Sequence, residues 1–171
     1  KSVAPSVKPM PTLGGVLKFG VPEELSHSQI LDIIDRFINA AEIAKQTGFT
    51  GVQLHSAHGY LLSEFLSPNI NNRTDQWGGS IENRSRLVIN IIDGIRAKVG
   101  NSFPISIKLN SSDFQKGGFT HEESIEVAKL LNSTSLDLLE ISGGTYENFA
   151  ALEIDSFNLK KMKTIKPQRS T

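Results

Sequence analysis

The sequence FTGVQLHSAHGYLL, from Phe49 to Leu62, joins a short apolar run to a dense polar one. Phe49 to Leu54 comes after a glycine that can end a helix, and an apolar run of this length is typical of a buried strand. His55 directly follows this predicted strand, and His58 and Tyr60 come next. We therefore predict a strand whose carboxyl end carries chemically active side chains.

The same order of elements occurs three times along the chain. Predicted helices start near Ser26, Ser80 and Thr120, and each precedes an apolar segment: Phe49 to Leu54, FPISIKLN and LDLLEIS. Ser26 with Gln29, and Thr120 with Glu123, have the spacing of capping boxes. The proline-rich start, Lys1 to Glu24, reads as an irregular arm. Alternating helices and strands predict an α/β fold with a parallel sheet.

An unusual loop follows each predicted strand. The three loops read HSAHGY, NSSDFQKGGF and SGGTYENF. Carboxyl ends of parallel strands are where open α/β sheets and (β/α)8 barrels assemble their active sites. This placement predicts an enzyme.

His55, His58 and Tyr60 can be interpreted in three ways. Two imidazoles can donate hydrogen bonds to one oxygen that gains negative charge, and a phenol can deliver a proton. Alternatively, one histidine satisfies backbone groups and the tyrosine packs. The third alternative is part of a metal site, although Glu64 is the only acid nearby in the sequence.

Lys108 lies in the predicted strand ISIKLN, near its carboxyl end, where an apolar residue is expected. A lysine there needs a negative partner. An anionic ligand or an electron-rich cofactor ring can supply one, and so can Glu140 on the neighbouring strand. Both alternatives stay open.

The segment Asn71 to Arg86 alternates acidic and basic side chains. We predict that they form a structural ion-pair lattice that orders a long loop, rather than a phosphate site. The residues concerned are Arg73, Asp75, Glu82, Arg84 and Arg86.

The composition excludes several classes of partner. Eighteen basic residues balance eighteen acidic ones, which leaves no net charge to attract nucleic acid or an anionic membrane. The chain contains no cysteine, so disulfides and thiolate metal sites are excluded. No apolar run approaches the length of about 20 residues that a membrane helix needs. We predict a cytoplasmic protein without a metal.

Several motifs together resemble the Old Yellow Enzyme family, the FMN-dependent NAD(P)H:flavin oxidoreductases and ene-reductases. The longest is GVQLHSAHGYLLSEFLSPNINNRTDQWGGSIENRSR. VAPS, FGVPEELS, IKLNSSDFQKGGFT and LLEISGGTYE extend the resemblance over roughly residues 2 to 148. IKLNSSDF and LEISGGTYE look most like the fungal members.

The resemblance implies a (β/α)8 TIM barrel with FMN at its carboxyl-terminal mouth. It also implies the reduction of activated C=C bonds, such as those of enones, by an FMN that NAD(P)H recharges. The expected partner is thus a small-molecule alkene.

The resemblance also implies a role for each residue. His55 and His58 match the pair that hydrogen-bonds the carbonyl or nitro oxygen of the substrate, and His55 is also a possible FMN contact. Some members have asparagine at the position of His58. Tyr60 matches the proton donor, and Lys108 matches the basic residue that lies against the flavin.

A complete barrel of this family is about twice as long as this chain. Residues 1–148 are therefore expected to form an incomplete barrel, about strands 4 to 6 with their helices, and residues 149–171 a divergent tail. Such a chain is either part of a longer protein or a remnant that binds FMN poorly. An oligomer or a complementary half-barrel could complete it.

Overall fold

A computed structural model of the chain describes residues 1–9 and 20–145. Its centre is a three-stranded parallel sheet with the strand order β3-β4-β5. The strands are β3 (Val52–Ser56), β4 (Ile105–Asn110) and β5 (Leu138–Ser142). The predicted α/β fold with a parallel sheet is confirmed.

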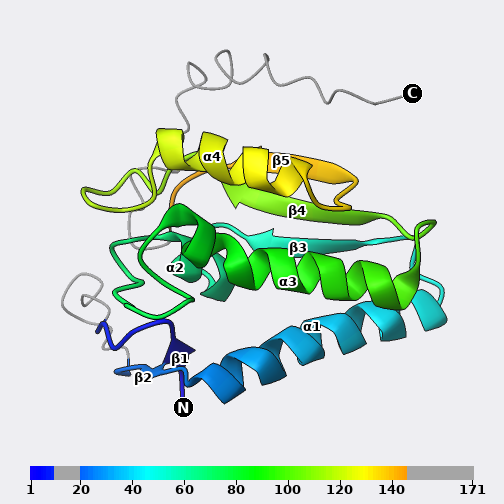
Figure 1. The fold of residues 1–171 in the computed structure, drawn as a ribbon, viewed down its shortest axis with the longest axis horizontal. Helices are drawn as coiled ribbons and strands as arrows, with labels where there is room; N and C mark the ends of the chain where they lie inside the picture. The colour runs from blue at the N-terminus through cyan, green and yellow to red at the C-terminus, as the bar shows by residue number, and fades with distance from the viewer. Residues whose placement is uncertain (10–19, 146–171) are drawn as a thin grey trace.

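Three long helices lie on one side of this sheet. Figure 1 shows α3 (Ile81–Val99) and α4 (His121–Asn132) side by side along the sheet, with α1 (His27–Gln46) next to α3. Helix α3 connects β3 to β4, and α4 connects β4 to β5. Each crossover therefore returns the chain to the neighbouring strand on the same side of the sheet.

Local hydrogen bonds explain where the helices begin. At α1 the Ser26 hydroxyl accepts from the Gln29 amide, and the Gln29 side chain accepts from the Ser26 amide. Thr120 and Glu123 make the same pair of bonds at α4. Each box satisfies two amides that the first helical turn leaves unpaired. Both predicted capping boxes are confirmed.

The core lies between the sheet and the helices. Ile105, Ile107 and Leu109 of β4 have no exposed surface, and neither do Leu87 and Ile91 of α3. Burying one such side chain contributes about 1.5–3 kcal/mol, which is why the apolar stripe of α3 faces the sheet.

The other sheet face is polar apart from Leu138, the register partner of Ser106. Side chains alternate along a strand, so the residues between the buried ones point away from the helices. We call this the open face, and it carries Gln53, His55, Ser106, Lys108 and Glu140. All five are partly or fully exposed.

The first strand begins later than predicted. Phe49 is 67% exposed, and its amide donates to the Ala44 carbonyl at 3.0 Å, so it caps the end of α1 instead of starting the strand. Strand β3 starts at Val52 and includes His55, which pairs with Lys108. His55 thus lies within the strand and not after it, because pairing with β4 continues past the apolar residues.

Three short elements were missing from the sequence prediction. A short helix, α2 (Leu61–Leu66), follows the HSAHGY loop and buries Leu62 and Phe65. Two-residue strands, β1 (Val3–Ala4) and β2 (Glu23–Glu24), pair in parallel within the predicted irregular arm. Such short elements have too few residues to show a period.

The end of the third loop, the predicted boundary at residue 148 and the predicted tail all lie outside the described residues. Within the part that is described, no helix is both long and apolar enough to cross a membrane.

Candidate active site

Three of the predicted site residues form one aromatic cluster. The ring centroids of His55 and His58 lie 5.1 Å apart in an edge-to-face arrangement. The Tyr60 ring centroid lies 4.9 Å from that of His55. The structure thus brings together two imidazoles and a phenol at the carboxyl end of β3.

The backbone of His58 has an unusual conformation. His58 and Gly59 have φ angles of 62° and 80°, both in the left-handed region. Histidine and asparagine enter this region more readily than most residues other than glycine. The turn bends the chain back, so that Tyr60 begins α2 and still faces His55.

Lys108 lies beside the cluster on the open face. It is the register partner of His55 on one side and of Glu140 on the other. Its ammonium lies 2.9 Å from a Glu140 oxygen, and the Gln53 amide donates to the other oxygen at 2.8 Å. The predicted alternative of a Lys108–Glu140 pair is confirmed.

The surroundings of both imidazoles favour the neutral form. Burial and the nearby Lys108 charge lower the pKa of His55. Burial, His55 and Lys108 lower the pKa of His58. The hydrogen bond from Lys108, followed by that from Gln53, lowers the pKa of Glu140. The site therefore contains a cation, a carboxylate and two neutral rings, each of which can donate one hydrogen bond.

The lowered pKa values predict how stability depends on pH. Between the ordinary histidine pKa of 6.5 and the lowered values, the unfolded chain binds protons that the folded chain does not. The stabilising contribution is complete above pH 6.5 and is lost progressively as the pH falls through this window. Urea unfolding from pH 7.5 to 5 should therefore show a falling free energy of unfolding.

A matched pair of variants tests whether His55 and His58 cause this pH dependence of the free energy of unfolding. We expect the double variant His55→Asn/His58→Asn to flatten it. His121→Asn, at the start of α4 and outside the cluster, should keep it. An unchanged slope in the double variant would show that other groups cause the pH dependence.

Asn110 connects the ends of the three strands. This role was not predicted from the sequence. Its side-chain oxygen accepts from the His58 amide at 3.2 Å, while its amide nitrogen donates to Asp113 Oδ1 and to the Gly144 carbonyl at 3.0 and 2.9 Å. Only 1% of Asn110 is exposed. An asparagine that ends an apolar strand was the available signal, because a buried amide requires partners.

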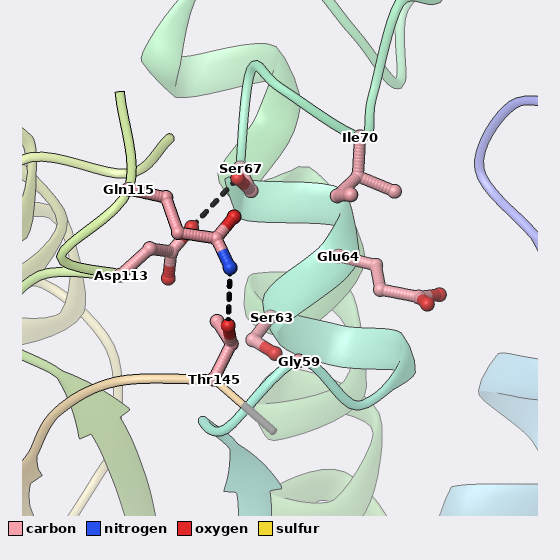
Figure 2. Close-up of a pocket in the computed structure, with 8 residues that line it drawn as sticks. All are labelled: Gly59, Ser63, Glu64, Ser67, Ile70, Asp113, Gln115 and Thr145. Atoms are coloured by element: carbon pink, nitrogen blue, oxygen red, sulfur yellow. Dashed lines mark hydrogen bonds between the residues drawn. The ribbon is translucent and has the colours of Figure 1, made fainter. Parts of the chain in front are cut away.

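Asp113 extends this network away from the aromatic cluster. Its carboxylate accepts from the Ser67 hydroxyl at 2.7 Å and from the Phe119 amide at 2.9 Å. Figure 2 shows Ser67 reaching Asp113 and Gln115 reaching Thr145 beside a small pocket. Gly59 and Thr145, which flank it, adjoin the His58 turn and the end of β5.

The predicted lattice in Asn71 to Arg86 is confirmed in part. Arg73, Asp75 and Arg84 form ion pairs, whereas Arg86 donates to the neutral Gln76 carbonyl and Asn83 side chain, and Glu82 has no ion pair among the described residues. Arg73 pairs with Asp75 at 2.6 Å and with Glu24 at 3.4 Å, and it donates to the Leu25 carbonyl at 2.7 Å. Arg84 pairs with Glu123. These arginines tie the loop to the start of α1 and to α4.

In residues 1–9 and 20–145, no group of three or more histidine, aspartate or glutamate side chains is placed to hold a metal ion.

The sequence profile of the NADH:flavin oxidoreductase / NADH oxidase family matches residues 9–165. The chain belongs to this family. Membership confirms the predicted flavin oxidoreductase family, with FMN as its cofactor and NADH or NADPH as its reductant.

Both bacterial and fungal proteins are related to this family member. The chain is 41% identical over 150 residues to an NADH oxidase of Thermoanaerobacter brockii. The aligned region covers 88% of this chain and 22% of that protein. It is 43% identical over 130 residues to the NADH-dependent flavin oxidoreductase nadA of Aspergillus parasiticus, covering 76% of this chain and 29% of that protein. The resemblance to fungal members in particular stays a prediction.

Solved structures show the same fold. A 2-naphthoyl-CoA reductase bound to 2-naphthoyl-CoA is 40% identical, with a TM-score of 0.80 over 85% of this chain and 22% of that one. An old yellow enzyme homologue from Zymomonas mobilis is 29% identical, with a TM-score of 0.72 over 85% of this chain and 45% of that one. The chain thus spans less than half the length of these proteins.

Proposed function

We propose that this family member is part of an FMN-dependent NAD(P)H oxidoreductase that reduces activated C=C bonds of small molecules. The observation that carries the proposal is the cluster of His55, His58 and Tyr60 beside Lys108, at the carboxyl end of parallel strands. The cluster combines hydrogen-bond donors, an acid and a cation.

We also propose that the sheet is part of a (β/α)8 barrel, about its strands 4 to 6. Two observations support this. The strands follow one another in order, and the helices lie along one side of the sheet (Figure 1). An open sheet wound in both directions would carry helices on both faces, whereas a barrel keeps its helices outside. The open face would then line the barrel interior.

The residues of the open face fit a flavin. Lys108 offers a cation to an electron-rich ring edge, and its side chain is 27% exposed. His55, its register partner, offers a neutral donor beside it. When bound, FMN supplies hydride to the alkene and takes it from NAD(P)H.

The roles of the side chains follow from their charge state. Neutral His55 and His58 would each donate a hydrogen bond to a carbonyl or nitro oxygen of the alkene and stabilise its growing negative charge. Preorganised donors of this kind contribute roughly 10²–10³ each in rate. Tyr60 would give its phenolic proton to the substrate carbon that does not receive the hydride.

Flavin titration tests the proposal. FMN fluorescence should be quenched on adding the chain, and Lys108→Met should weaken binding about tenfold, equivalent to ~1.4 kcal/mol. Lys129→Met is the matched control, because Lys129 pairs with Glu126 on the exposed side of α4. It should bind FMN like the unmodified chain.

Two results would contradict the proposal. If the chain does not bind FMN, it is catalytically inactive as it stands, which is the remnant alternative. If both variants bind equally well, Lys108 does not contact the flavin.

A further inference from the structure

Two side chains at neighbouring strand ends hold His58 from different directions. Asn110 is the last residue of β4 and Ser142 the last of β5, and they are register partners. The Asn110 side-chain oxygen accepts from the backbone amide of His58. The Ser142 hydroxyl oxygen lies 2.6 Å from Nε2 of the His58 ring. One residue therefore holds the backbone, and the other holds the ring.

Hydrogen bonds fix the orientation of the Asn110 side-chain amide. Both hydrogens of its amide nitrogen are used, by Asp113 and by the Gly144 carbonyl. This leaves its oxygen pointing at His58, in a site where a rotated amide would bury unpaired groups. The left-handed conformation of His58 is thus fixed by contacts more than 30 residues away in sequence.

The Ser142 contact determines the chemistry of the ring. A neutral imidazole has one nitrogen that donates and one that accepts, and the bond at one nitrogen decides the state of the other. Nε2 is occupied by Ser142, while Nδ1 has no hydrogen-bond partner among residues 1–9 and 20–145. Nδ1 is therefore the ring nitrogen available to a ligand.

The hydroxyl proton of Ser142 favours one tautomer. Among the described residues, Nε2 of His58 is the acceptor that lies within hydrogen-bonding distance of the Ser142 hydroxyl. If Ser142 donates to Nε2, then Nδ1 carries the proton and can donate to an anionic oxygen. In the opposite case, Nδ1 would present a lone pair and repel that oxygen.

We propose that Asn110 and Ser142 are positioning residues that hold His58 as its Nδ1–H tautomer, with the Ser142 hydroxyl donating to Nε2. The inference rests on the proposed function, which requires His58 to donate to the substrate oxygen. Neither residue needs to touch the substrate or the flavin.

Nitrogen NMR of the chain tests the tautomer. In a sample labelled with ¹⁵N histidine at pH 8, long-range ¹H–¹⁵N spectra should show His58 protonated at Nδ1. We expect Ser142→Ala to lower the ratio of the Nδ1–H to the Nε2–H form about fivefold to tenfold, the value of one hydrogen bond. Ser106→Ala, also on the open face but bonded to the Val52 carbonyl, should not change it.

Amide hydrogen exchange tests the backbone contact. In Asn110→Ala, the His58 amide should exchange about tenfold faster, while that of Ile107 in the same sheet stays protected. Equal acceleration at both amides would show general loosening and would overturn the positioning role of Asn110. An Nε2–H tautomer in the unmodified chain, or an unchanged ratio in Ser142→Ala, would overturn that of Ser142.

Neither measurement requires flavin. A chain that shows the Nδ1–H tautomer but binds no FMN would retain the positioning role and lose the proposed function. A chain that binds FMN with His58 as Nε2–H would retain the function and lose the positioning role.

Discussion

Tyr60→Phe is expected to slow the reduction of an activated alkene by 10²–10⁴-fold, the usual contribution of a positioned general acid. The substitution removes the phenolic proton and leaves the ring, which packs 4.9 Å from His55. The backbone of Tyr60 should stay in place, because its carbonyl accepts from the Ser63 hydroxyl and the Glu64 amide at the start of α2. The loss should therefore report mainly on proton delivery.

The measurement is stopped-flow reoxidation of the flavin-loaded, prereduced chain by an enone. The rate at saturating enone should fall, while the enone concentration at half-saturation stays within a factor of about two, because the hydroxyl acts in the transition state. Tyr60 is 55% exposed, so water has access to the same position. A rate equal to that of the unmodified chain would assign the proton to solvent and remove Tyr60 from the mechanism.

Arg84→Met is expected to lower the free energy of unfolding by about 3 kcal/mol. Only 5% of Arg84 is exposed, and its guanidinium donates to the carbonyls of Leu66 and Gly79 and to Glu123. Methionine keeps much of the volume but leaves two carbonyls without their donor. Each buried group that loses its partner costs about 1–3 kcal/mol, whereas Glu123 can recover water because its side chain is 24% exposed.

Urea unfolding at pH 7.5 measures this loss, with Arg36→Met as the control. Arg36 pairs with Asp32 within one exposed face of α1, and both side chains are more than half exposed. Such a pair contributes about 0.3–0.5 kcal/mol. If both variants unfold at the same urea concentration, Arg84 is not a structural anchor of the loop.

The sequence alone predicted the elements that depend on near neighbours. Helices α1 and α4 could be located because Ser26 and Thr120 bond to groups three residues away, a distance that the sequence displays directly. The buried face of α3 followed from its 3.6-residue period. The candidate residues followed from their place at strand ends, since parallel strands bring those ends to one edge.

Contacts between distant residues needed the tertiary structure. Trp77, the single tryptophan, is 1% exposed and donates to His27 Nδ1 at 3.0 Å, across 50 positions of sequence. No local pattern indicates this pair. Whether two residues far apart in sequence lie close in space depends on the register of the strands and the packing of the helices.

The stretch from Phe49 to Leu62 shows both contributions. Its residue types predicted a strand followed by two imidazoles and a phenol, because apolar runs bury themselves and polar groups remain at the strand end. Only the tertiary structure decided that β3 continues through His55, that Lys108 pairs with Glu140, and that Asn110 and Ser142 hold His58. The register of β4 and β5 places these side chains, and pairing between distant strands determines that register.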